Sequence, residues 1–263
     1  MSFIAANNHS LRITAIGRMQ KQRAIFSLNL KPSNHVQQGQ YMMVSQSRSI
    51  KALKLASTFI AAFALSSNLA LANPSERTLS QFNQAAQGDS GLVDTVYGEL
   101  SKQLEEQGAT PVTLVYLGSA ETLQGREAFM PWNKMKFTER GLATIQKGLD
   151  LMANQPVPLQ EQQRLQGLPE YQLATAMAAT TFTSLPDMFN HFERGYELYL
   201  SLLDEPSFSQ QPFAATSWIY RYAIEAALRA EDVQQAKTWL AQMEQLGDSN
   251  LETQTAKALL AKY

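Results

Sequence analysis

The sequence predicts an all-α protein built from stacked antiparallel helical hairpins, with an export signal before the helical part. Apolar residues recur at spacings of three and four along the chain from about residue 73 onward, as amphipathic helices require. That part of the sequence shows no run of alternating β-branched residues, which a sheet would require. The connections between the helical stretches are short, which favours antiparallel neighbours packed as hairpins.

Charged residues are divided unevenly along the chain. Residues 1–72 contain eight Lys or Arg residues and no Asp or Glu, although the whole chain has 22 basic and 23 acidic residues. The remaining part therefore carries 14 basic and 23 acidic residues, a net charge of −9. This boundary indicates two segments with different roles. The acidic balance of the second segment argues against nucleic acid as a partner, because nucleic acids select clustered Lys and Arg.

A secretory signal peptide is predicted over residues 43–72. A basic stretch at 47–54 precedes 11 uncharged, mostly apolar residues at 55–65, and Ala70-Leu71-Ala72 provides a signal peptidase site. We expect cleavage between Ala72 and Asn73. The apolar run is shorter than the roughly 20 residues of a membrane span, so no stable span is expected after cleavage. An uncleaved N-terminal anchor is the alternative.

Residues 1–42 precede this signal. They are interpreted either as the result of a start codon assigned too far upstream, with translation actually starting at Met42 or Met43, or as a disordered extension. An organellar transit peptide is the rival interpretation, since such peptides are also rich in Arg and Ser. The chain has no cysteine, so a lipid anchor, disulfides and thiolate metal sites are excluded. The expected location is the bacterial periplasm or the exterior, reached by a Sec-type signal.

The part from residue 73 to residue 263 is expected to form one domain of about eight helices. Thr110-Pro111 has the composition of an N-cap followed by a first-turn proline. Ser184 with Asp187 resembles a capping box, and Ser249 with Glu252 is expected to cap the last helix. The apolar stripes of the expected helices lie at residues 93–104, 114–123, 142–152, 173–177, 189–203, 218–226 and 236–243, followed by the last short helix.

A short internal repeat supports stacking of similar units. Glu-Arg-Gly occurs at 139–141 and again at 193–195, a separation of 54 residues. Glycine within a helix costs about 1 kcal/mol relative to alanine. We therefore expect Gly141 and Gly195 to be placed where two helix backbones come close together.

Residues 213–246 resemble a tetratricopeptide-type hairpin. An alanine-rich first helix, an acidic turn at Glu231-Asp232 and the stretch Ala236-Lys237-Thr238-Trp239-Leu240 are similar to that family's pattern. Ile224 occupies a position where the family has a small residue, and the 54-residue offset is longer than the usual repeat of about 34 residues. The resemblance implies stacked hairpins and a groove for a peptide or protein, and it assigns no individual site residues.

No catalytic, metal or cofactor motif is found in the sequence. His191 is the only histidine after residue 72, and no nucleophile accompanies it in a recognised arrangement. Glu121 with Glu127, and Glu105 with Glu106, are the carboxylate pairs that a cell-wall-glycan-acting enzyme or accessory protein could use, and the sequence does not distinguish either pair from a solvated helix face. A small-ligand carrier is a further alternative, and it would require an enclosed apolar cavity of several hundred cubic ångströms.

One cluster combines basic and aromatic residues in this acidic part of the chain. Arg126, Lys134 and Lys136 lie close in sequence to Phe129 and Trp132. Arg and Trp often anchor protein interfaces, and a local positive patch suits a carboxylate or phosphate. We therefore predict that these five residues bind a protein or peptide partner in the cell envelope. The alternative is that the aromatic residues pack a hairpin turn while the lysines are solvated.

Overall fold

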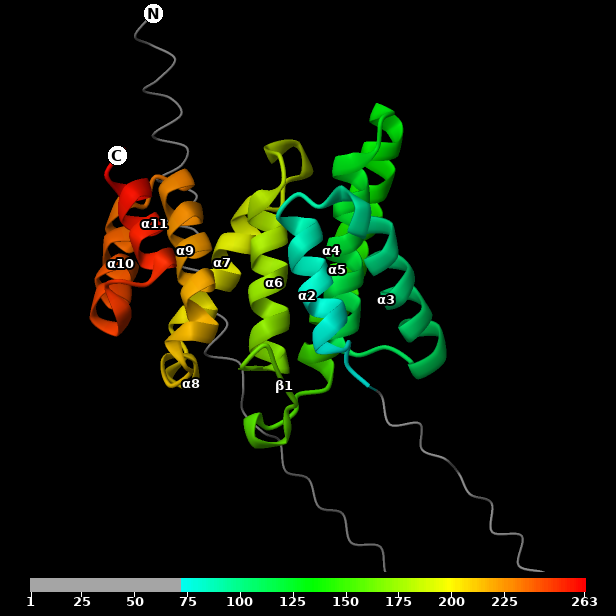
Figure 1. The fold of residues 1–263 in the computed structure, drawn as a ribbon, viewed down its shortest axis with the longest axis horizontal. Helices are drawn as coiled ribbons and strands as arrows, with labels where there is room; N and C mark the ends of the chain where they lie inside the picture. The colour runs from blue at the N-terminus through cyan, green and yellow to red at the C-terminus, as the bar shows by residue number, and fades with distance from the viewer. Residues whose placement is uncertain (1–71) are drawn as a thin grey trace, which may run out of the picture. The chain divides into compact units, whose positions relative to one another are not determined.

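The computed structural model of the chain describes residues 72–263. The predicted signal peptide and the extension before it lie outside the described residues, apart from Ala72 at the expected cleavage site. The described residues form an all-α fold with ten α-helices, which confirms the predicted fold class (Figure 1). None of these helices is both long and apolar enough to cross a membrane.

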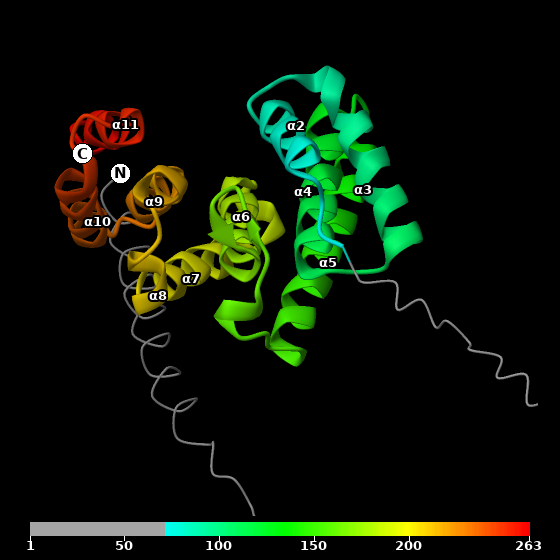
Figure 2. The ribbon, with the colours of Figure 1, turned by 60° about the horizontal axis from the view of Figure 1, so that its bottom comes forward.

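Most consecutive helices pack beside one another along the domain (Figures 1 and 2). The α-helices are α2 (Glu76–Ala86), α3 (Val93–Gln107), α4 (Pro111–Glu127), α5 (Pro131–Asn154), α6 (Glu170–Ser184), α7 (Phe192–Leu203), α8 (Pro206–Ser209), α9 (Phe213–Arg229), α10 (Val233–Gly247) and α11 (Leu251–Leu260). Three 3-10 turns, η1 (Ser90–Leu92), η2 (Leu159–Glu161) and η3 (Asp187–Phe189), and a two-stranded hairpin of β1 (Arg164–Leu165) and β2 (Leu168–Pro169) connect them.

The helix starts agree only in part with the caps predicted from local sequence. Thr110 is the N-cap of α4, and its hydroxyl accepts a hydrogen bond from the Thr113 backbone N–H at 3.1 Å. Asp232 caps α10 in the same way. The capping box expected at Ser184 is wrong, because the Ser184 hydroxyl donates back to the Thr180 carbonyl at 2.6 Å, within the last turn of α6. The last helix is capped by Asn250 and not by the neighbouring serine.

Helices α4 and α5 share the most extensive contact among the described helices, and glycines line it. A β-carbon added at Gly118 of α4 would lie 2.5 Å from the Gly141 carbonyl oxygen and 2.7 Å from the backbone nitrogen of Ile145. Gly125 and Gly148 meet the opposite helix at similarly short distances. The close backbone approach expected at Gly141 is therefore confirmed.

The expectation for Gly195 is confirmed in the second Glu-Arg-Gly segment. A β-carbon there would lie 2.8 Å from the β-carbon of Phe182 and 3.0 Å from the Ala179 carbonyl oxygen, both on α6. Gly141 thus packs α5 on α4, and Gly195 packs α7 on α6. Four buried alanines of α6 allow the same close approach to its neighbours: Ala174, Ala176, Ala178 and Ala179.

At the C-terminal ends of three helices, a basic side chain from a later helix donates hydrogen bonds to backbone carbonyls. Arg126 donates to the carbonyls of the last two residues of α2, at 2.9 and 3.0 Å. Lys134 of α5 donates to the carbonyl of Arg126, in the last turn of α4, at 2.9 Å. Arg229 of α9 donates to the carbonyls of Thr183 (2.5 Å) and Leu185 (3.2 Å) where α6 ends. Cations at helix C-termini satisfy free carbonyls and complement the helix dipole.

Candidate functional site

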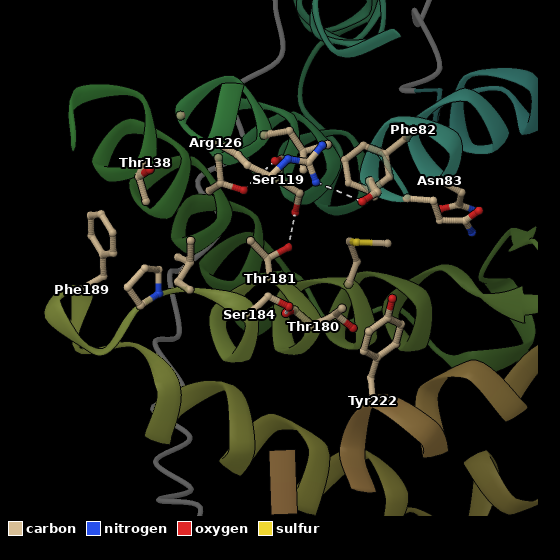
Figure 3. Close-up of a pocket in the computed structure, with 18 of the residues that line it drawn as sticks. Phe82, Asn83, Ser119, Arg126, Thr138, Thr180, Thr181, Ser184, Phe189 and Tyr222 are labelled. Carbon is tan, nitrogen blue, oxygen red and sulfur yellow. Dashed lines mark hydrogen bonds between the residues drawn. The ribbon is translucent and has the colours of Figure 1, made fainter. Parts of the chain in front are cut away.

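An open groove of about 930 Å³ runs between two walls of helices (Figure 3). One wall comes from α2, α4 and α5, and the other comes from α6, η3 and α9. We call this the central groove. Its apolar lining side chains are Phe82, Ala86, Leu123, Pro131 and Met135 on the first wall, and Met177, Leu185, Pro186, Met188, Phe189, Ala214, Ala215, Trp218 and Tyr222 on the second.

The lining residues of each wall lie on one face of their helix. In α6 they are Met177, Thr180, Thr181 and Ser184, a spacing of three, four and seven residues that places side chains on a common face. Residues 119, 122, 123 and 126 of α4 repeat this spacing, and so do residues 131, 134, 135 and 138 of α5. The groove is therefore formed by regular helix faces.

A pair of buried hydroxyls lies between the two walls. Ser119 of α4 and Thr181 of α6 are hydrogen-bonded to each other at 2.8 Å, and both are buried (Figure 3). Thr180 donates to the Ala176 carbonyl at 2.8 Å and lies 2.7 Å from the hydroxyl of Tyr199. Burial raises the pKa of the Tyr199 phenol, so this hydroxyl stays neutral.

Charge in the groove is opposite in sign to that of the domain. Its lining includes the cations Arg126, Lys134 and Arg221, and Glu252 is the single carboxylate among the described lining residues. Arg221 donates from Nε to Glu252 at 2.5 Å, and its guanidinium lies 3.6 Å from the centre of the Tyr222 ring. The two-carboxylate arrangement of a glycan-cleaving site is not found among these lining residues.

The five residues predicted to bind a partner are divided between the groove and its surroundings. Arg126 and Lys134 line the groove, where both also cap helices. Phe129 and Trp132 lie at the α4–α5 turn with 87% and 66% of their surface exposed, next to the lining residues of α5. Lys136 is exposed and is not one of the lining residues.

The carboxylates considered as a catalytic pair have separate environments. Glu121 is buried, accepts a hydrogen bond from the Thr144 hydroxyl at 2.7 Å, and pairs with Arg140 at 2.8 Å. Burial raises its pKa, while Thr144 and Arg140 act in the opposite direction. Glu127 is exposed and pairs with the adjacent Arg126. Neither glutamate lines the central groove.

His191 precedes α7 and packs against Phe182, with 5.1 Å between ring centres. Its Nδ1 lies 2.5 Å from the Phe189 carbonyl oxygen. In the described part of the chain, no group of three or more His, Asp or Glu side chains is placed to hold a metal ion.

The second wall of the groove was not identified from the sequence. The face of α6 that carries Met177 and three hydroxyl residues could have been recognised by its helical spacing. Its role becomes apparent only when α6 is placed opposite α4. Comparison of the chain with protein-family models, with curated proteins and with solved structures gave no match. The fold and site together define an all-α domain with an open, largely apolar groove.

Proposed function

We propose that this protein is an exported, non-enzymatic binding module that holds an apolar segment of a partner protein in the central groove. The groove itself is the observation that supports this proposal: about 930 Å³ lined by apolar side chains from two walls. Large apolar clefts with a few polar groups are the usual binding sites of proteins. The proposed setting is the periplasm or the exterior, which is where the predicted signal peptide would direct the protein.

The exposed α4–α5 turn extends the binding surface beyond the groove. Phe129, Met130 and Trp132 expose much of their apolar surface there, and Met188 is 64% exposed on the opposite wall. Contiguous exposed apolar residues are typical of interaction sites. The proposed partner therefore contacts the aromatic residues of the turn as well as the interior of the groove.

A tetratricopeptide-like stack is the proposed architecture behind the groove. In the hairpin of α9 and α10, Ala236 and Leu240 are buried, as the Ala-x3-Phe pattern of that family's second helix would require. The equivalent packing of Gly141 and Gly195 is what a repeated hairpin would produce.

Affinity capture from an envelope extract, followed by mass spectrometry, tests this function. Met188→Glu places a charge on a groove-lining side chain that is already exposed, so folding should be retained. Leu251→Glu is the matched control, because Leu251 is 79% exposed and lies outside the groove. A protein captured by the wild type and by Leu251→Glu, and lost with Met188→Glu, supports the proposal. Equal capture by all three variants contradicts it.

A carrier for a small apolar ligand is the second candidate function. The volume of the groove, about 930 Å³, falls within the roughly 300–1,000 Å³ of ligand pockets, although the groove is open and not the enclosed cavity expected of a carrier. The fluorescent probe N-phenyl-1-naphthylamine should then bind with high affinity to the wild type and to Leu251→Glu. Its affinity for Met188→Glu should be lower. Tight probe binding without any groove-dependent protein capture would favour the carrier over the partner-binding module.

A further inference from the structure

The hydroxyl groups that α4 and α6 contribute to the groove walls are bonded within the protein. Ser119 and Thr181 bond to each other, and Thr180 bonds to Tyr199 and to a carbonyl of its own helix. Thr122 and Ser184 donate to helix carbonyls at 2.7 and 2.6 Å. The walls are helices, whose backbone groups are also paired internally. The α4 and α6 walls therefore offer an occupant few free hydrogen-bonding groups. The other uncharged polar side chains that line the groove from α2, α5 and the β1–β2 turn are the amides of Asn83, Gln87 and Gln166 and the Thr138 hydroxyl.

The shortage of free hydrogen-bonding groups on these walls favours some conformations of a bound segment over others. An extended peptide presents unpaired backbone N–H and C=O groups, and burying them without partners costs free energy. A helix pairs its backbone groups internally and presents an apolar stripe to a groove. The central groove consequently suits a helical segment better than an extended one.

The charges of the groove determine which residues should flank that stripe. Three cations and one carboxylate line it, within a part of the chain that carries a net charge of −9. Arg221 is neutralised by Glu252 and Arg126 pairs with Glu127. The Lys134 ammonium donates to a carbonyl and has no carboxylate partner within the described residues. An acidic side chain on the occupant would complete this pairing.

Resting on the proposed function, we infer that the occupant of the central groove is an amphipathic α-helix of a partner protein whose apolar stripe is flanked by Asp or Glu. The apolar side chains pack between Met135 and Leu123 on one wall and Met177 and Trp218 on the other. An acidic residue at the edge of the stripe pairs with Lys134. Complementary charge gives this interaction its specificity, and the apolar contact gives most of its affinity.

Three labelled peptides of roughly 18 residues, a length at which isolated helices become stable, test this inference by fluorescence anisotropy. All three carry leucines at spacings of three and four. The first has glutamates beside the stripe, the second has lysines there, and the third is the glutamate peptide with a central proline. We expect the glutamate peptide to bind about tenfold more tightly than the lysine peptide. The proline should weaken binding about a hundredfold, because it breaks the helix.

Lys134→Gln should weaken binding of the glutamate peptide about three- to fivefold, as expected for a partly exposed ion pair. Lys136→Gln removes the same charge two positions away, outside the groove lining, and should have a smaller effect. Equal binding of the acidic and basic peptides would overturn the charge assignment, and tight binding of the proline peptide would overturn the helical conformation. If no peptide binds while N-phenyl-1-naphthylamine does, the proposed function itself fails.

Discussion

The contact between α4 and α5 provides the sharpest test of the packing described above. A β-carbon on residue 141 would lie 2.7 Å from the Thr122 methyl carbon and 3.0 Å from the Thr122 backbone nitrogen. The Gly118 carbonyl oxygen would be closer still. Two of these three neighbours are backbone atoms of α4, so the strain of Gly141→Ala cannot be relieved by rotating one side chain.

We expect Gly141→Ala to lower the free energy of unfolding by about 2 kcal/mol. Overpacking a tight contact costs about 1–3 kcal/mol, or more where the backbone must shift, and the higher helix propensity of alanine offsets up to about 1 kcal/mol of this cost. In a domain of this size, such a change lowers the melting temperature by roughly 4–8 °C. Thermal unfolding followed by circular dichroism measures it directly.

Gly98→Ala is the matched control for this experiment. Gly98 lies in the middle of α3, and nothing lies within 4 Å of a β-carbon added there. Only the helix propensity then applies, so the variant should be more stable than wild type by about 0.5–1 kcal/mol. If Gly141→Ala also melts at or above the wild-type temperature, the two helix backbones are not in the contact described here.

Three further predictions concern titration, capping and the exposed turn. Burial raises the pKa of Glu121 above its ordinary value of 4.5. The contribution of Glu121 to the free energy of unfolding should therefore fall as pH rises through the folded-state pKa. Urea denaturation from pH 4.5 upward should show a weaker fall for Glu121→Gln than for the wild type. Arg229→Met should cost about 1–2 kcal/mol in the same assay, because carbonyls at the end of α6 lose a charged donor; a value near zero would contradict this capping role. Phe129→Ala with Trp132→Ala should change stability by less than about 0.5 kcal/mol, since both side chains are exposed, and should reduce partner capture; a large loss of stability would show that these residues pack the turn.

Much of the helical architecture could be predicted from local sequence, because caps, prolines and apolar spacing act within a few residues. Thr110-Pro111 and Asp232 mark helix starts for this reason. Helix α2 was not predicted, since only four of its residues are buried and its composition is polar. Ser184 was misinterpreted because a serine before a proline can equally end a helix, and its hydroxyl bonds backward to α6.

The candidate site was predicted only in part, because it depends on contacts between distant segments. Arg126 and Lys134 of the predicted cluster line the groove, whereas Phe129, Trp132 and Lys136 do not. The sequence could not show that Arg126 reaches the end of α2, some 40 residues earlier, or that Lys134 reaches the end of α4. Charge reversal at these two positions would therefore disturb helix ends as well as any binding. Phe129 and Trp132 are the better positions at which to test an interface.

The arginine side chains that cap the C-terminal ends of α2 and α6 also affect how the domain unfolds. Releasing α9 would remove Arg229 from the end of α6, and displacing α4 would remove Arg126 from the end of α2. Each helix end is thus protected by a later part of the chain, so local opening of one hairpin weakens the one before it. Hydrogen exchange should accordingly be cooperative across neighbouring hairpins instead of being confined to single helices. Neighbour-dependent opening of this kind is how stability is shared in stacked helical proteins.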